Sequence, residues 1–135
     1  MRMMRKQTEI IYPELSYKIN GLLMETQSRL GRFCREKQYG DYFEILLKKS
    51  GLKYIREPSV DFKIETEIVK GNRIDFIIDD KILVEMKAVP FLTKKDYYQT
   101  MRYLRSANLK LALLVNFHSE YLKPKRVLNS SHHSH

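Results

Sequence analysis

The stretch RIDFIIDDKILVEMK, residues 73–87, decides the fold, because it predicts a β-hairpin in the middle of the chain. Aliphatic and β-branched residues fill two runs, 73–78 and 82–88, and the acidic pair Asp79-Asp80 lies between them. Such runs on either side of a short polar turn are typical of paired antiparallel strands. The second run is almost wholly apolar, so we expect its strand to lie in the centre of a sheet.

Charged side chains within this hairpin are the candidates for chemistry. Glu85 and Lys87 are two residues apart in one strand, so they point to the same face. Asp75 precedes Glu85 by ten residues. A three-residue loop centred on Asp80 would place these two carboxylates opposite each other, about 5 Å apart at Cβ. A strict two-residue turn at Asp79-Asp80 would break this register unless a bulge restored it.

Two carboxylates at this distance repel each other and favour a divalent cation that prefers oxygen ligands, Mg²⁺ or Mn²⁺. The alternative is an ordinary surface hairpin in which Glu85 and Lys87 only flank one another. The pattern Asp-x₉-Glu-x-Lys is loose enough to occur by chance in basic proteins. Taken alone, these residues leave both interpretations open.

Periodicity predicts two helices and a strand before the hairpin, and a helix and a strand after it. The last strand is a continuous apolar run, which is typical of a strand covered on both faces. The expected elements are helices 13–30 and 36–50, strand 62–68 with a turn at 70–72, a helix from an N-cap at Thr93 to about residue 107, and strand 111–115. This order predicts an α/β fold, a mixed central sheet of about four to five strands flanked by helices.

Length and composition fit one globular domain. The chain has 135 residues, 43% hydrophobic and 30% charged, and no apolar run approaches the roughly 20 residues that a membrane span needs. We expect a single domain over 1–128, a flexible polar tail over 129–135 and no membrane association. Residues 1–6 lead into no apolar signal core, and the single cysteine, Cys34, excludes an internal disulfide. Both observations favour the cytoplasm.

Basic residues are in excess along the whole chain. The net charge is +9, with +5 in residues 1–60 and +4 in residues 61–135. A positive field of this kind favours polyanions such as nucleic acid. The alternative is that the charge only keeps the protein soluble.

Short motifs follow one another in a characteristic order from about residue 14 to residue 128. They are Leu30-Gly31, Glu36-x-x-Tyr39, Asp75, Glu85-Met86-Lys87-Ala88, Gln99-x-x-x-Tyr103, Leu114-Val115-Asn116-Phe117 and Lys125-Arg126-Val127-Leu128. In this order they resemble the PD-(D/E)XK nuclease superfamily, and within it the small bacterial GxxExxY type. Two positions depart from the pattern. Phe33 stands where a glycine precedes the Glu by three residues, and Ile74 stands where a proline precedes the first Asp.

The resemblance implies a restriction-endonuclease-like core and hydrolysis that depends on Mg²⁺ or Mn²⁺. It implies that Asp75 and Glu85 ligate the metal with the backbone carbonyl of Met86, and that Glu36 holds the metal or a metal-bound water. Lys87 would orient or activate the attacking water and offset charge on the phosphate. The expected catalytic residues are Glu36, Asp75, Glu85, Lys87 and Gln99.

Gln99 and Tyr103 share a helix face and resemble the Gln-x-x-x-Tyr element of RecB-like nucleases, which supports the site and contacts DNA. Basic side chains on and near this helix are candidates for contacts with the nucleic-acid backbone, the alternative being a solvated surface. The expected nucleic-acid-binding residues are Arg102, Tyr103, Lys94, Lys95, Arg105, Lys125 and Arg126, with Lys123 as a further candidate.

These observations together predict a metal-dependent nuclease that hydrolyses phosphodiester bonds, in DNA rather than RNA. One alternative is a nucleic-acid-binding module of the same fold that does not cut. Another is a non-enzymatic partner subunit whose basic surface docks on a second protein, and a homodimer is compatible with the sequence. The complete acidic set together with Lys87 favours the nuclease.

Overall fold

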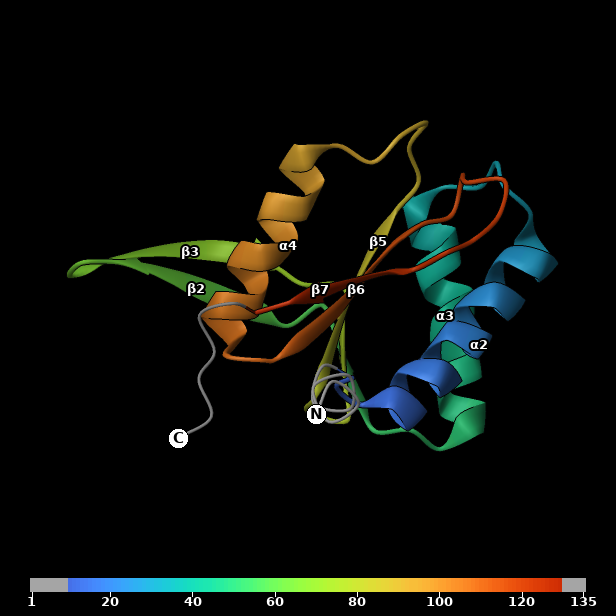
Figure 1. Ribbon diagram of the computed structural model, residues 1–135, viewed down its shortest axis with the longest axis horizontal. Helices are drawn as coiled ribbons and strands as arrows, with labels where there is room; N and C mark the ends of the chain where they lie inside the picture. Colours follow the sequence, from blue (N-terminus) through green and yellow to red (C-terminus); the bar gives the residue numbers. More distant parts are fainter. Residues whose placement is uncertain (1–9, 130–135) are drawn as a thin grey trace, which may run out of the picture.

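A mixed five-stranded β-sheet with helices on both faces forms the body of the computed structural model, which describes residues 10–129 (Figure 1). The expected α/β fold, with a mixed sheet flanked by helices, is confirmed. The helices are α2 (Pro13–Leu30), α3 (Glu36–Ser50) and α4 (Lys94–Ala107). The strands are β1 (Tyr54–Arg56), β2 (Ser59–Ile64), β3 (Glu67–Arg73), β4 (Phe76–Ile78), β5 (Ile82–Lys87), β6 (Leu111–Asn116) and β7 (Lys125–Leu128).

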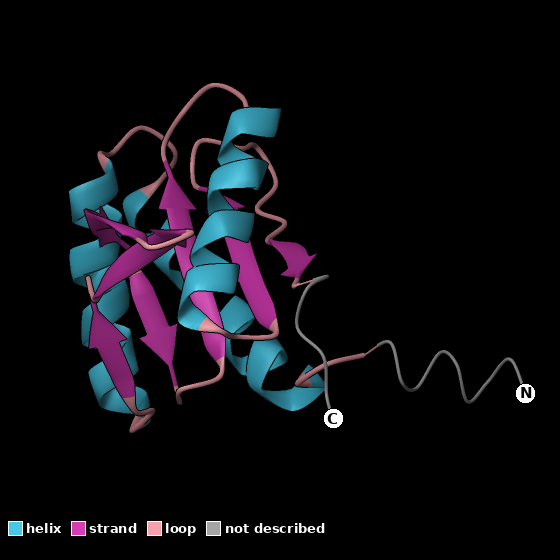
Figure 2. Cartoon of the chain, turned by 90° about the vertical axis from the view of Figure 1, so that its left-hand side faces the viewer, coloured by secondary structure: helices cyan, strands magenta, loops and turns pink. Residues whose placement is uncertain are grey.

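The sheet has the strand order β1-β4-β5-β6-β7, in which β5 and β6 are parallel and the other neighbours antiparallel. Helix α4 connects β5 to β6, as a parallel pair requires. Helices α2 and α3 pack on one face of the sheet and α4 on the other. Figure 2, seen from the α4 side, shows this helix in front of the strands. All residues of β6 are buried, as its apolar run predicts.

The ends of the helices agree with the capping signals in the sequence. Gly31 and Gly51 follow the last residues of α2 and α3, both at positive φ, where glycine is least strained. Thr93 is the N-cap of α4, and its side chain and that of Asp96 each accept a hydrogen bond from the other residue's amide.

The β4–β5 hairpin has the register that the sequence predicts. Phe76 pairs with Val84 and Ile78 with Ile82, which leaves a three-residue loop centred on Asp80. Asp79 and Asp80 both have a φ of 55°, a left-handed conformation that Asp tolerates better than most residues. The loop therefore needs no bulge to bring Asp75 next to Glu85.

A separate two-stranded ribbon, β2–β3, extends from the body beside α4 (Figure 1). The prediction of one strand over 62–68 and a turn at 70–72 was wrong, because the turn lies at Glu65-Thr66 and residues 70–72 belong to β3. Apolar residues happen to keep their alternation across this tight turn, so period alone could not reveal it. The expected strand 73–78 is also divided, by a bend at Asp75.

Strands β1 and β7 are short edge strands that the sequence analysis did not predict. Asn129, the first residue of the expected flexible tail, is buried, and its amide donates to the carbonyls of Leu104 and Leu109. The rest of that tail, residues 130–135, and the N-terminal residues 1–6 lie outside the described residues. Within residues 10–129, no helix has the length and apolarity required to cross a membrane.

Candidate active site

Two crossed hydrogen bonds hold Asp75 and Glu85 together at the open end of the β4–β5 hairpin. The backbone amide of Asp75 donates to Glu85 Oε1 at 2.9 Å, and the amide of Met86 donates to Asp75 Oδ2 at 2.6 Å. The pairing of Phe76 with Val84 explains this contact, since Asp75 comes one residue before β4. The expected approach of the two carboxylates is therefore present in the fold.

Burial makes this pair electrostatically unusual. Glu85 is only 4% exposed; burial raises its pKa to about 8, and the negative charge of Asp75 adds to the rise. Burial also raises the pKa of Asp75, to about 6, and the charge of Glu36 adds to it, whereas the Met86 amide lowers it. Near neutral pH the pair therefore resists carrying two negative charges unless a cation compensates them.

Lys87 lies on the same face of β5 as Glu85 and contacts α4. Its Nζ donates to Gln99 Oε1 at 3.2 Å and lies 3.8 Å from Asp96 Oδ1. The sequence analysis placed Gln99 at the site but assigned no site role to Asp96. The signal for Asp96 was its spacing of three residues from Gln99, which puts both on one helix face.

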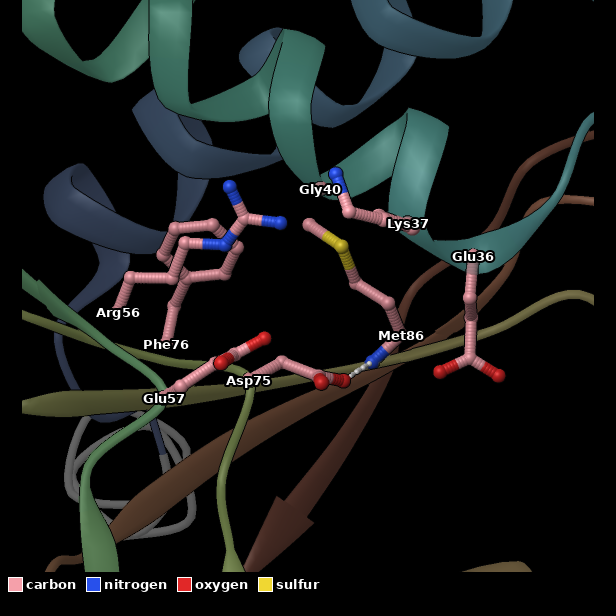
Figure 3. A pocket seen from close by; sticks show the side chains of 8 residues that line it. All are labelled: Glu36, Lys37, Gly40, Arg56, Glu57, Asp75, Phe76 and Met86. Atoms are coloured by element: carbon pink, nitrogen blue, oxygen red, sulfur yellow. Dashed lines mark hydrogen bonds between the residues drawn. The ribbon is translucent and has the colours of Figure 1, made fainter.

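A cavity of about 300 Å³ opens beside Asp75, between α3 and the β1–β4 edge of the sheet (Figure 3). Glu36, the first residue of α3, is exposed at its rim and contributes to the raised pKa of both buried carboxyls. The residues that line the cavity are Glu36, Lys37, Gly40, Arg56, Glu57, Asp75, Phe76 and Met86. Sequence reasoning missed Arg56 and Glu57, because it did not predict β1.

Arg56 is fixed in the wall of this cavity by acidic side chains of α3. Its Nη1 lies 2.8 Å from both Asp41 Oδ1 and Glu44 Oε1, and its guanidinium lies 5.4 Å from the centre of the Phe76 ring. A Cβ added at Gly40 would come within 2.7 Å of Arg56 Nη2. Gly40 is thus the residue that leaves room for the guanidinium.

Tyr39 fixes the start of α3, and with it Glu36. The ring is fully buried and stacks on Phe117, with centroids 4.2 Å apart. Its hydroxyl donates to the Gly31 carbonyl at 2.6 Å and accepts from the Cys34 amide at 3.2 Å. The motifs that contain Gly31 and Tyr39 therefore meet the distant motif that contains Phe117 at this tyrosine.

Tyr103 belongs to the core and does not lie on the surface. It is 6% exposed, and its ring lies 6.0 Å from that of Phe62. Burial raises its pKa, and the charges of Glu85 and Asp75 add to the rise. This burial corrects the expectation that Tyr103 contacts nucleic acid and leaves it a supporting position behind the site.

The basic candidates on and near α4 are exposed: Lys94, Lys95, Arg102, Arg105, Lys123, Lys125 and Arg126. Arg126 also makes contacts within the fold, because its guanidinium donates to Ser16 Oγ and to the Ile11 carbonyl and so fastens β7 to the start of α2. Contacts of these side chains with nucleic acid stay a prediction.

Carboxylates around the cavity do not form a complete metal cage. Within residues 10–129, no group of three or more His, Cys, Asp and Glu side chains is arranged to hold a metal ion. Glu36 therefore does not join Asp75 and Glu85 as a third direct ligand in this arrangement.

Comparisons with known proteins agree on the fold. A sequence model of the PD-(D/E)XK nuclease superfamily matches residues 13–127. Among solved structures, the crystal structure of SSO0001 is similar, with a TM-score of 0.51 and 15% sequence identity. The match covers 82% of this chain and only 65% of the length of that one, and at this identity it shows the fold alone. No curated protein matches the chain.

Proposed function

Because this chain belongs to the PD-(D/E)XK nuclease superfamily, we propose that it is a nuclease that depends on Mg²⁺ or Mn²⁺ and hydrolyses phosphodiester bonds in DNA. Asp75 and Glu85 are the proposed metal-binding carboxylates. Lys87 is the proposed catalytic cation, and Gln99 positions it. Membership of the narrower GxxExxY type is part of the same proposal.

The observation that carries the proposal is the buried pair of carboxylates, Asp75 and Glu85, with Lys87 on the same strand as Glu85. Buried acids of this kind are costly unless they are paired or bind a cation. The Lys87 ammonium contacts Gln99 and Asp96, and among residues 10–129 it forms no ion pair with either carboxylate. A purely structural arrangement would more simply have neutralised the pair with a direct ion pair.

The oxygens of the pair fit a hard divalent cation. Backbone amides occupy Asp75 Oδ2 and Glu85 Oε1. Among residues 10–129, the second oxygen of each carboxylate has no hydrogen-bond donor, and neither carboxylate forms an ion pair. Carboxylate oxygen is the ligand type that Mg²⁺ and Mn²⁺ prefer. The Met86 carbonyl and water, with Glu36 acting through water, are the proposed further ligands.

The chain's own residues account for the rest of the proposed chemistry. A bound divalent cation supplies charge neutralisation and a more acidic water. Gln99 and Asp96 restrain the Lys87 ammonium, so that its charge is fixed before a phosphate arrives. A preorganised cation of this kind stabilises negative charge that develops on the phosphate oxygens. Tyr39 keeps Glu36 at the rim by anchoring the first turn of α3.

Cleavage of plasmid DNA by the purified protein, with Mg²⁺, Mn²⁺ or EDTA, tests the proposal. We expect cleavage with either metal and none with EDTA. Asp75→Asn and Glu85→Gln keep the shape of each side chain but remove a negative ligand, so each should lower the rate on the order of a hundredfold or more. The matched control is Glu25→Gln, an exposed acid of α2, which should cut like the wild type.

Equal activity in wild type and both site variants would indicate a contaminating nuclease and contradict the proposal. Absence of cleavage on every form of DNA and RNA, with Mn²⁺ binding and DNA binding retained, would favour the alternative of a binding module that does not cut.

A further inference from the structure

A stripe of exposed side chains runs along the outer face of α4, away from the sheet. Lys94, Tyr98, Arg102 and Arg105 follow one another at steps of four, four and three residues, so they form one line on the helix. At about 1.5 Å per residue the line is about 17 Å long. Tyr98 is 56% exposed, which makes it an apolar ring among cations.

Three surface hollows flank this stripe and share its residues. The first, of about 520 Å³, reaches from Lys94 and Tyr98 to Lys125 of β7. The second, of about 500 Å³, joins Tyr98 to Arg102 and Arg105. The third, of about 210 Å³, joins these two arginines to the β2 residues 62–64. Together they form a continuous surface, the α4 track, from β7 to the β2–β3 ribbon. None of the described residues that line it is acidic.

Aromatic rings and cations alternate along the α4 track. Lys125 Nζ lies 5.5 Å from the centre of the Tyr97 ring, and the Arg102 guanidinium lies 5.9 Å from that of Phe62. The rings of Tyr97 and Tyr98 meet edge to face at 5.7 Å, so the more exposed Tyr98 is braced by its neighbour. A braced, exposed ring between cations can offer its face to a flat ligand that carries negative charge.

We propose that the α4 track binds single-stranded DNA, with a base stacked on Tyr98 and phosphates beside Lys94, Arg102 and Arg105. Aromatic rings interleaved with a positive groove are the means by which proteins hold single strands without reading their sequence. A duplex cannot use Tyr98 in this way, because its base faces are already stacked on each other. The inference rests on the proposed function for its substrate class, and it assigns the nuclease a strand with an unpaired portion.

Helix α4 joins the track to the candidate active site. Gln99, the residue after Tyr98, reaches inward to Lys87, while Tyr98 is exposed. The track and the Lys87 contact therefore lie on different faces of the same helix.

The test measures binding of the full chain to a fluorescein-labelled oligothymidylate and to a blunt duplex of the same length, by anisotropy in EDTA. Tyr98→Ala should weaken binding of the single strand by about fivefold to a hundredfold, the range seen when a base-stacking aromatic is removed. Tyr98→Phe should restore binding, and the affinity for the duplex should hardly change. The control is Tyr17→Ala, a tyrosine of α2 that is 81% exposed.

Equal losses in Tyr98→Ala and Tyr17→Ala, or an equal loss for the duplex, would overturn the inference. So would an unchanged affinity of Tyr98→Ala for the single strand. Because no metal is present, these outcomes do not depend on cleavage. Metal-dependent cutting by a protein whose Tyr98 does not matter would refute the track and leave the proposed function standing. Binding that depends on Tyr98, in a protein that never cuts, would support the track and refute the proposed nuclease activity.

Discussion

Glu85 accepts a hydrogen bond from the amide of Asp75, and Asp75 accepts one from the amide of Met86, so the hairpin sets the separation of the two carboxylates. Such a pair is preorganised, since neither carboxylate has to be brought into place when a cation binds. The cost of this arrangement appears in the raised pKa of each group, whose main cause is burial.

The stability of the metal-free protein should depend on the protonation of Glu85. Its pKa rises from about 4.3 in an unfolded chain to about 8 in the fold, so the folded state binds the proton more tightly. The stabilising effect of that proton is complete below the unfolded pKa and is lost as pH rises through the folded one. Glu85→Gln should therefore gain stability relative to wild type as pH rises from about 5 to about 9.

Urea denaturation in EDTA across this pH range measures the difference between variant and wild type, with Glu25→Gln as the control. Added Mg²⁺ should stabilise the wild type most at the alkaline end, where the bare pair is charged. A difference between Glu85→Gln and wild type that stays constant with pH would contradict the assignment of the raised pKa to Glu85.

At the scale of elements, helix α3 carries a glycine where helix propensity disfavours one. Gly40 lies in the interior of α3 at an ordinary helical φ, so backbone freedom does not explain it. The Arg56 guanidinium explains the glycine, because it lies where a Cβ of residue 40 would be. Gly21, in the interior of α2, has nothing within 4 Å of the same position and serves as its natural counterpart.

Alanine substitutions at the two glycines should therefore have opposite effects on stability. Gly21→Ala should raise the free energy of unfolding by about 0.5–1 kcal/mol, the usual advantage of alanine within a helix. Gly40→Ala should lower it, because Arg56 is held by Asp41 and Glu44 and cannot move away without loosening those ion pairs. Urea denaturation at one pH measures both. Equal stabilisation by the two substitutions would show that the Arg56 side chain moves freely.

At the scale of the whole molecule, the candidate site draws side chains from both helical layers. Helix α3 supplies Glu36 from one face of the sheet, and α4 supplies Gln99 and Asp96 from the other. The net charge of +9 belongs to the chain as a whole and favours polyanions. Binding and cutting are therefore expected to be separable, since the field does not depend on any one residue.

The affinity for DNA should survive Lys87→Ala and fall steeply with salt. Most of the binding free energy of a basic protein comes from release of counterions at phosphates, and one half-buried lysine contributes little to it. Titration of labelled duplex with wild type and with Lys87→Ala at several salt concentrations, in EDTA, measures how the affinity of each protein falls with salt. The logarithm of affinity plotted against the logarithm of salt concentration should have nearly the same slope for both proteins. An affinity that ignores salt would mean that the basic surface serves another partner.

The sequence alone determined the parts of the fold that rest on local pattern. Apolar spacing and capping residues placed α2, α3 and α4, and the composition of residues 73–87 placed the hairpin whose register brings Asp75 to Glu85. These features depend on interactions between residues close together in the chain, which periodicity records. The motif order identified the superfamily for the same reason, since it preserves spacing.

Only the tertiary structure decided which side chains are free, engaged or buried. Arg126 and Lys125 are neighbours in sequence, yet Arg126 fastens β7 to the start of α2, whereas the Lys125 ammonium lies over the Tyr97 ring of α4. Tyr103 is in the core, although Arg102, the residue before it in α4, is exposed. Asp96 lies near Lys87 because α4 packs on one face of the sheet. Such contacts join segments that are distant in the chain, so their existence depends on how the layers pack and leaves no periodic trace in the sequence.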